Sequence, residues 1–125
     1  MNTVIYPNQR SYIRYDDAHF LLYLNEEVIE DYLPDDAEEG TTPVTAYSYT
    51  GSFPDGGTLI SAREETYDEF VSGLVRSRYS SDQVEAIILN LQSGDPDRID
   101  EFQQEMDDLI AWRSECKQIA AYLLL

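Results

Sequence analysis

The sequence predicts an α+β fold, in which a small antiparallel β-sheet in the N-terminal half packs against a C-terminal unit of two or three helices. Up to about residue 62, short runs of strand-forming residues alternate with turn residues. From residue 66 onward, apolar residues recur at steps of three and four behind helix-capping residues. We therefore expect a single domain over residues 1–125, with a β-rich half at 1–62 and a helical half at 66–125.

Strand character recurs in the N-terminal half in residues 4–6, 11–15, 19–24, 44–49 and 58–62. The run 19–24 is almost continuously apolar, which suits a strand buried on both faces. Residues 7–9 form either a hairpin turn or a loop between the first two strands. The segment 58–62 is expected to pair with 44–49 in a hairpin, across the Gly- and Pro-rich turn 51–57.

Residues 26–33 are compatible with two structures. The segment has apolar residues at helical spacing and a proline that would end a helix: Val28, Ile29, Tyr32, Leu33 and Pro34. A further strand is the alternative. The loop 35–43 that follows is acidic and contains Gly, Thr and Pro.

Three helices are expected in the C-terminal half. The first two begin at residue pairs with capping-box spacing, Thr66 with Glu69 and Ser80 with Gln83. Gly94 is expected to end the second helix. Asp95 is then placed to cap the last helix, with Pro96 as its first residue. The short links between helices favour antiparallel packing.

The chain carries 25 Asp and Glu against eight Lys and Arg, a formal net charge of -17. Acidic residues at the start of the last helix, and Arg113 and Lys117 toward its end, complement the helix macrodipole. The macrodipole does not explain the acidic residues of the N-terminal half. We expect an acidic surface there, formed by Glu26, Glu27, Glu30, Asp31, Asp35, Asp36, Glu38 and Glu39. Such a surface repels nucleic-acid phosphates and attracts basic partners.

We expect no catalytic, cofactor-binding or metal-binding residues. Adjacent carboxylates occur at 16–17, 35–36 and 107–108, but paired-acid catalysis needs two carboxylates across a cleft, one with a raised pKa. One cysteine and one histidine are too few for a Cys/His zinc site. His19 is expected to have a structural role, and Cys116 to be a buried, inert thiol.

Aromatic and apolar residues are the better functional indication. Tyrosine is favoured at protein interfaces, and seven of the ten tyrosines fall by position 49. The residues expected to bind a partner are Tyr47 and Tyr49 beside the turn, Trp112, and the apolar end Leu123, Leu124 and Leu125. The alternatives are burial of several tyrosines under the helices, packing of Trp112 on the sheet, and docking of the apolar end within the same chain.

Two parts of the sequence resemble a known group of proteins. One is YSYTG at 47–51 with DGGT at 55–58, and the other is RSRYSSDQVEAI at 76–87 followed by AWR at 111–113. They resemble small accessory proteins encoded beside tail-fibre and other virion genes of tailed phages and prophages. The late Trp-Arg helix is similar to the C-terminal part of tail-fibre assembly proteins. The resemblance implies a non-enzymatic virion or assembly role.

The expected function is therefore a non-catalytic protein-interaction module of a tailed phage, either a virion structural or adaptor component or a fibre-assembly factor. Its partners would be other virion or phage proteins, or further copies of itself, without direct nucleic-acid or membrane binding. No signal peptide or transmembrane segment is recognisable, so we expect the host cytoplasm during assembly, or the virion. The alternative is an acidic DNA mimic that inhibits a basic nucleic-acid-binding host protein, and a small enzyme ranks last.

Overall fold

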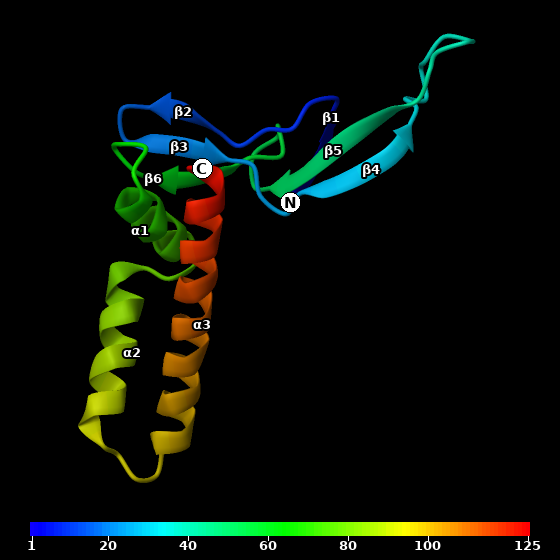
Figure 1. Cartoon of the computed structure of the whole chain (residues 1–125). Coiled ribbons are helices and arrows are strands. Elements are labelled where there is room, and N and C mark those ends of the chain that lie inside the picture. The colour runs from blue at the N-terminus through cyan, green and yellow to red at the C-terminus, as the bar shows by residue number, and fades with distance from the viewer. The chain divides into compact units, whose positions relative to one another are not determined.

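The computed structural model describes all 125 residues and contains six strands and three helices (Figure 1). The chain divides into two compact units, Met1–Leu59 and Ile60–Leu125. The α+β class is confirmed, with two small antiparallel sheets where the sequence suggested one.

The first sheet has the strand order β1-β5-β4, from β1 (Asn2–Tyr6), β5 (Val44–Gly51) and β4 (Glu27–Tyr32). Both neighbours run antiparallel to β5. Tyr6, Tyr47 and Val28 lie opposite one another across the three strands, and therefore share one face of the sheet. Strand formation by β4 resolves the ambiguity of residues 26–33.

An irregularity in β4 explains why its apolar residues stand at helical spacing. The pairing with β5 shifts between Ile29 and Tyr32, and Asp31 adopts a positive φ of 52°. Such a bulge breaks the strict alternation of a strand. A positive φ is tolerated best by Gly, Asn and Asp among the residue types.

The second sheet has the order β2-β3-β6, from β2 (Tyr12–Asp16), β3 (His19–Leu22) and β6 (Thr58–Ser61). Phe20, Leu21 and Leu22 are all buried, as expected for a strand covered on both faces. Because β1 and β2 belong to different sheets, residues 7–11 are a connecting loop rather than a hairpin turn.

The expected hairpin between 44–49 and 58–62 is wrong. The two edges of β5 are already occupied by β1 and β4, so β6 joins the other sheet. The turn between them folds back tightly: the Phe53 amide donates to the Gly57 carbonyl at 3.0 Å. A Cβ on Gly51 would lie 2.2 Å from the Gly57 oxygen, so a side chain cannot fit there.

The helices are α1 (Tyr67–Arg78), α2 (Ser81–Ser93) and α3 (Ile99–Leu123). Ser80 and Gln83 form the complete capping box before α2, and Gly94 ends it in the left-handed conformation. Thr66 caps α1 by accepting from the Glu69 amide.

The start of the last helix differs from expectation. It begins at Ile99 rather than Pro96, and its N-cap Arg98 makes no side-chain cap. Asp95 instead accepts from the Asp97 amide at 3.0 Å through its side chain, and from the Arg98 amide through its carbonyl. This local turn uses the capping groups of Asp95 before a helix can form.

Helix α3 is the central helix of the helical unit, because both α1 and α2 pack against it. Phe70, Leu74, Cys116 and Ala120 are completely buried. Gly73 is also buried, at the point where α1 packs closely against Ser61 at the end of β6. A Cβ on Gly73 would lie 2.6 Å from the Ser61 carbonyl oxygen. The glycine therefore permits the close contact.

Candidate interaction surfaces

Strands β4 and β5 form a hairpin connected by residues 33–43, which reach away from the sheet (Figure 1). β1 pairs only with residues 47–51 of β5, so the distal part of the hairpin is two-stranded. In this part Val44 is 49% exposed, and Leu33 just beyond the end of β4 is 46% exposed; Val28, 54% exposed, lies where the sheet still has three strands. Two-stranded ribbons are only marginally stable in water, and apolar side chains at such a site favour contact with a partner.

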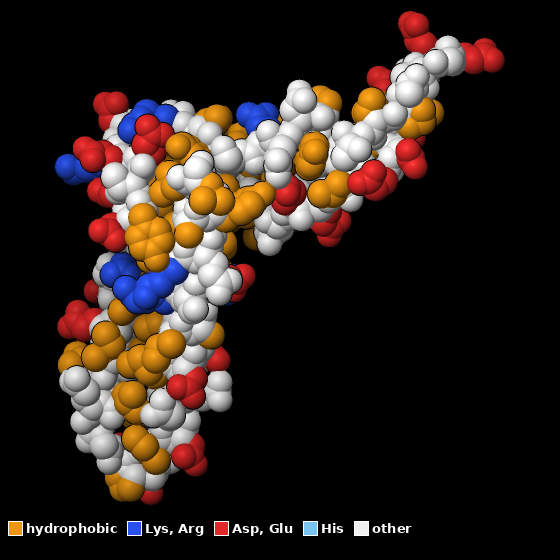
Figure 2. Space-filling model, in the orientation of Figure 1, with side chains coloured by type: hydrophobic (Ala, Val, Ile, Leu, Met, Phe, Trp, Pro, Cys, Tyr) orange, Lys and Arg blue, Asp and Glu red, His pale blue; other side chains and the backbone are white.

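We call the end of this ribbon the hairpin tip. Its apolar part is Leu33 with Val44, and Val44 pairs with Tyr32 across the ribbon. Its carboxylates are Asp31, Asp35, Asp36, Glu38 and Glu39, all of them exposed. Figure 2 shows acidic and hydrophobic side chains side by side along this hairpin.

The acidic residues expected to form a surface lie on β4, just before it, and in the loop after it. Met1–Leu59 contains eleven carboxylates but only two cationic side chains, Arg10 and Arg14. Both guanidinium groups lie over aromatic rings. Arg10 is 4.4 Å from the ring centroid of Tyr6 and 4.5 Å from that of Tyr23, and Arg14 is 4.5 Å from that of Phe20.

Glu26 differs from the other seven acidic residues, because it is half-buried and has a structural role. Its Oε1 accepts a 2.7 Å hydrogen bond from the Tyr49 hydroxyl. The Gln9 amide donates to both carboxylate oxygens, at 2.9 and 3.2 Å. Glu26 thus fixes the loop before β2 to the sheet.

Tyr49, expected at a partner interface, is instead completely buried. Its ring packs against Tyr6 and Tyr23, with centroids 6.2 and 5.7 Å away, and its hydroxyl accepts from the Arg10 amide at 2.8 Å. The Tyr49 ring points inward from β5 and forms the aromatic core of the Met1–Leu59 unit together with Tyr6 and Tyr23.

Tyr23 adds a second polar anchor to this core. Its hydroxyl donates a 2.8 Å hydrogen bond to Asp55 Oδ2. Burial, and then this hydrogen bond to a carboxylate, raise the pKa of Tyr23 to about 12. The Tyr6 hydroxyl donates to the backbone carbonyl of the same Asp55, so the turn 51–57 is held against the tyrosines.

Tyr47 remains a surface candidate. It is half-buried and lies in one row with Tyr6 and the exposed Val28. This row continues the buried tyrosine core outward onto one face of the sheet. It can therefore present a preorganised aromatic and aliphatic contact.

Trp112, expected at a partner interface, is buried within the helical unit. The side chain is 8% exposed, and the Arg78 guanidinium lies 3.6 Å from its ring centroid. At the apolar end, Leu123 is buried, Leu124 is half-buried, and Leu125 is completely exposed. Of the three leucines, Leu125 is the most accessible to a partner.

A second candidate surface lies on the helical unit and was not predicted. α1, α2 and α3 enclose an open groove of about 540 Å³, within the size range of small-molecule pockets. Its floor is aliphatic and is lined by Val71 and Val75 of α1, Val84 and Ile88 of α2, and Met106, Leu109 and Ile110 of α3. Ile88 is 38% exposed and Ile110 57%. We call this cavity the helical groove.

The helical groove has an unusual charge for this chain. Arg76, Arg113 and Lys117 line it together with a single carboxylate, Asp68. Three of the eight cationic side chains of the chain therefore meet at one apolar cavity. Figure 2 shows Lys and Arg side chains gathered on the helices beside hydrophobic ones.

One sequence pattern could have indicated this groove. Met106, Ile110, Arg113 and Lys117 follow one another at steps of three and four, so the cations continue an apolar stripe on one helix face. Their interpretation as partners of the macrodipole is wrong, because the last turn of α3 contains no basic residue and the dipole acts mainly within that turn. The macrodipole also does not account for their clustering with Arg76 of another helix.

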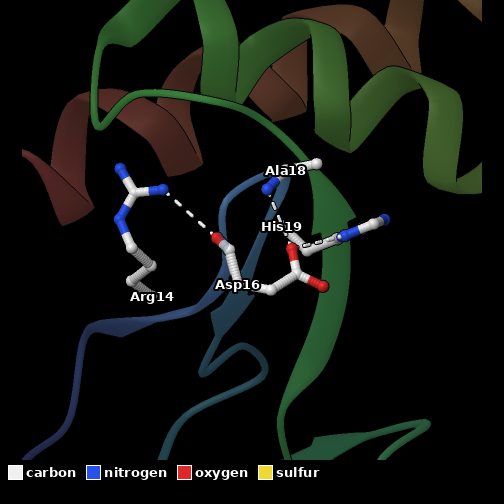
Figure 3. A network of polar contacts seen from close by, with 4 residues as sticks. All are labelled: Arg14, Asp16, Ala18 and His19. Atoms are coloured by element: carbon white, nitrogen blue, oxygen red, sulfur yellow. Dashed lines mark hydrogen bonds and ion pairs between the residues drawn. The ribbon is translucent and has the colours of Figure 1, made fainter.

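His19 is the first residue of β3, and its side chain contacts Asp16 at the end of β2 (Figure 3). Its Nδ1 lies 2.8 Å from Asp16 Oδ1, and the same oxygen accepts from the Ala18 amide at 2.8 Å. The Ala18 and His19 hydrogen bonds lower the pKa of Asp16. The Arg14 guanidinium also donates to the Asp16 carbonyl at 3.2 Å, so all these contacts stabilise the link between β2 and β3.

No group of three or more His, Cys, Asp or Glu side chains is arranged to hold a metal ion. The carboxylates of Asp107 and Asp108 each accept a hydrogen bond from a glutamine one helical turn earlier, Gln103 and Gln104. None of the helices combines the length and apolar character needed to cross a membrane.

Comparison with known proteins gives no match to a protein family, to a curated protein or to a solved structure.

Proposed function

We propose that this chain is a non-catalytic protein-interaction module of a tailed phage, acting as a virion structural or adaptor component or as a fibre-assembly factor. The observation that carries the proposal is the β4–β5 hairpin, which exposes Val28 where β1 also pairs with β5, and further apolar side chains at its two-stranded end. Exposed apolar side chains on a preformed sheet are typical of protein-binding surfaces.

The row formed by Tyr6, Tyr47 and Val28 supplies the contact for a virion partner. Tyr6 is held by its hydrogen bond to Asp55, and Tyr47 is half-buried. These side chains therefore lose little conformational entropy when a partner covers them. The surrounding carboxylates favour a partner with a basic rim.

The test is to quantify this chain in purified particles by mass spectrometry and to identify cross-links to other virion proteins. We expect stoichiometric incorporation, or transient cross-links to a fibre protein during assembly. Val28→Ser should reduce the cross-links at least several-fold. Leu89→Ser is the matched control, because Leu89 is 55% exposed on α2, outside both candidate surfaces. Absence from particles together with absence of cross-links to any virion protein would refute the proposal.

A second candidate function is a DNA mimic that inhibits a basic nucleic-acid-binding protein. The run of exposed carboxylates on β4 and the loop 33–43, with no cation between Arg14 and Arg63, favours it. Phosphate mimicry predicts that the chain competes with DNA and that the competition weakens with added salt.

Charge reversal tests this alternative, provided that structural acids are spared. Glu26 holds Tyr49 and Gln9, and Asp31 has a positive φ, so neither should be changed to lysine. Glu27→Lys with Glu30→Lys changes only exposed residues of the same strand. Inhibition of DNA binding that survives this double change would exclude the mimic.

A further inference from the structure

We infer that the hairpin tip of one copy of this chain docks into the helical groove of a second copy, so that copies assemble head to tail. The inference goes beyond the proposed virion role and stands independently of it, because it concerns only the purified chain.

The apolar parts of the two surfaces fit each other. The tip presents Leu33, 46% exposed, and Val44, 49% exposed, at the end of a projecting hairpin. The groove offers an aliphatic floor that leaves Ile88 and Ile110 partly open to solvent. Its volume of about 540 Å³ is sufficient for a few apolar side chains.

The charges of the two surfaces are opposite. The tip carries carboxylates only, since the chain has no Lys or Arg between Arg14 and Arg63. The groove brings together Arg76, Arg113 and Lys117 against the single carboxylate of Asp68. An acidic, apolar segment is therefore the occupant that the groove favours.

The high net charge makes this contact selective. Two copies with a formal charge of -17 repel each other in most orientations. Attraction arises where the cationic groove of one copy faces the acidic tip of another. Charge repulsion elsewhere thus opposes alternative contacts between copies.

The two surfaces are different parts of the chain, so the contact is heterologous. Each bound copy still offers one free tip or one free groove. Such contacts produce rings where the rotation closes and open chains where it does not. A symmetric dimer would use the same patch twice and would stop at two copies.

The first experiment measures self-association of the full chain by sedimentation velocity. We expect species larger than a monomer at high protein concentration and about 50 mM salt, and their loss at about 500 mM salt. Arg113→Gln with Lys117→Gln should weaken association about tenfold or more. Gln92→Glu with Gln118→Glu is the matched control: it makes the same change in net charge on exposed positions outside the groove, and it should leave association nearly unchanged.

The second experiment mixes two variants that each lack one surface. Leu33→Ser removes an apolar contact of the tip, so that the tip should no longer bind. Arg113→Glu with Lys117→Glu reverses the charge of the groove, so that the groove should no longer bind an acidic tip. Each should be monomeric alone, and the mixture should form 1:1 dimers and nothing larger, since only one productive contact remains. Circular dichroism checks that each variant is folded, and Val44→Ser provides a second tip variant.

Three results would overturn the inference. The wild-type chain could stay monomeric under all these conditions, which would leave the groove to a different protein. Association could be insensitive to both the groove and the tip variants. The mixture of monomeric variants could also fail to form dimers.

Discussion

At the residue scale, Tyr23 links a buried aromatic core to a turn through one hydroxyl. The hydrogen bond to Asp55 requires the neutral phenol as donor. Burial makes the phenolate costly, and the nearby carboxylate adds to that cost. This hydrogen bond therefore stabilises the fold only while Tyr23 is protonated.

A pH dependence at alkaline pH follows from Tyr23. Its pKa is about 12 in the folded chain and about 10 when unfolded, so the folded state binds more protons between these values. Stability contributed by Tyr23 is complete below pH 10 and falls as pH rises toward 12, by at most about 1.4 kcal/mol per pH unit. Urea titrations across this window should show a shallower loss for Tyr23→Phe. Tyr15→Phe, at an exposed tyrosine, should retain the wild-type slope.

Cys116 should be unreactive in the folded chain. It is completely buried, and burial followed by the nearby Glu115 raises the pKa of its thiol to about 11. Only the thiolate attacks thiol reagents, so labelling requires opening of the helical unit. We expect labelling by an aromatic disulfide reagent to be about a hundredfold slower, or more, than in denaturant. Rapid labelling of the native chain would contradict burial of this face of α3.

At the element scale, α1 depends on a residue that disfavours helices. Gly73 lies in the middle of α1, where alanine would be favoured by about 1 kcal/mol on propensity alone. A Cβ there would approach the Ser61 oxygen to 2.6 Å and Ile60 Cδ1 to 3.0 Å. The contact with the backbone cannot relax by a simple rotamer change.

Gly73→Ala should therefore destabilise the chain, despite the better helix former. We expect a loss of about 1–3 kcal/mol, typical of overpacking. Ser72→Ala is the control, because Ser72 is exposed on the same helix and should gain slightly or stay unchanged. Denaturant unfolding followed by Trp112 fluorescence measures both. Equal stability of the two variants would mean that α1 can move away from β6.

Elements governed by local rules could be predicted from the sequence. The capping box of Ser80 and the glycine end of α2 at Gly94 rest on contacts within a few residues, and both were confirmed. Strand pairing depends on distant residues. The turn 51–57 predicted a hairpin, but β1 from the start of the chain occupies the edge that β6 would need. The start of α3 was misplaced because Asp95 and Pro96 form a turn of their own.

At the scale of the whole molecule, charge is the dominant property. Most of the 25 carboxylates are exposed, and Arg98 with Glu101 forms an ion pair on the surface. Because the chain has only eight Lys and Arg, pairing can compensate only a minority of the carboxylates. Repulsion among the carboxylates destabilises the compact state.

The midpoint of thermal unfolding should accordingly rise with salt. We expect an increase of several degrees between about 20 and 300 mM NaCl, because the screening length shortens across that range. Measurements at low protein concentration separate this effect from self-association. A midpoint that is constant or falls with salt would show that the carboxylates are neutralised in another way.

The candidate surfaces could be predicted only in part at this scale. Composition located the acidic residues of the hairpin, because a run without cations is visible in the sequence. It could not identify the helical groove, since Arg76 and Lys117 are distant in sequence and meet only through packing on α3. Tyr49 and Trp112 have the residue types of interface anchors, but the same types also fill cores, and both are buried.

The position of Trp112 has a practical consequence for spectroscopy. It is the only tryptophan and lies in Ile60–Leu125, whereas seven of the ten tyrosines lie in Met1–Leu59. Tryptophan emission excited at the red edge therefore reports on the helical unit alone. Near-ultraviolet dichroism in the tyrosine region is weighted toward the packed rings of Tyr6, Tyr23 and Tyr49. The two units thus carry separate intrinsic optical labels, and coincidence of the two unfolding curves would be the signature of a single cooperative transition.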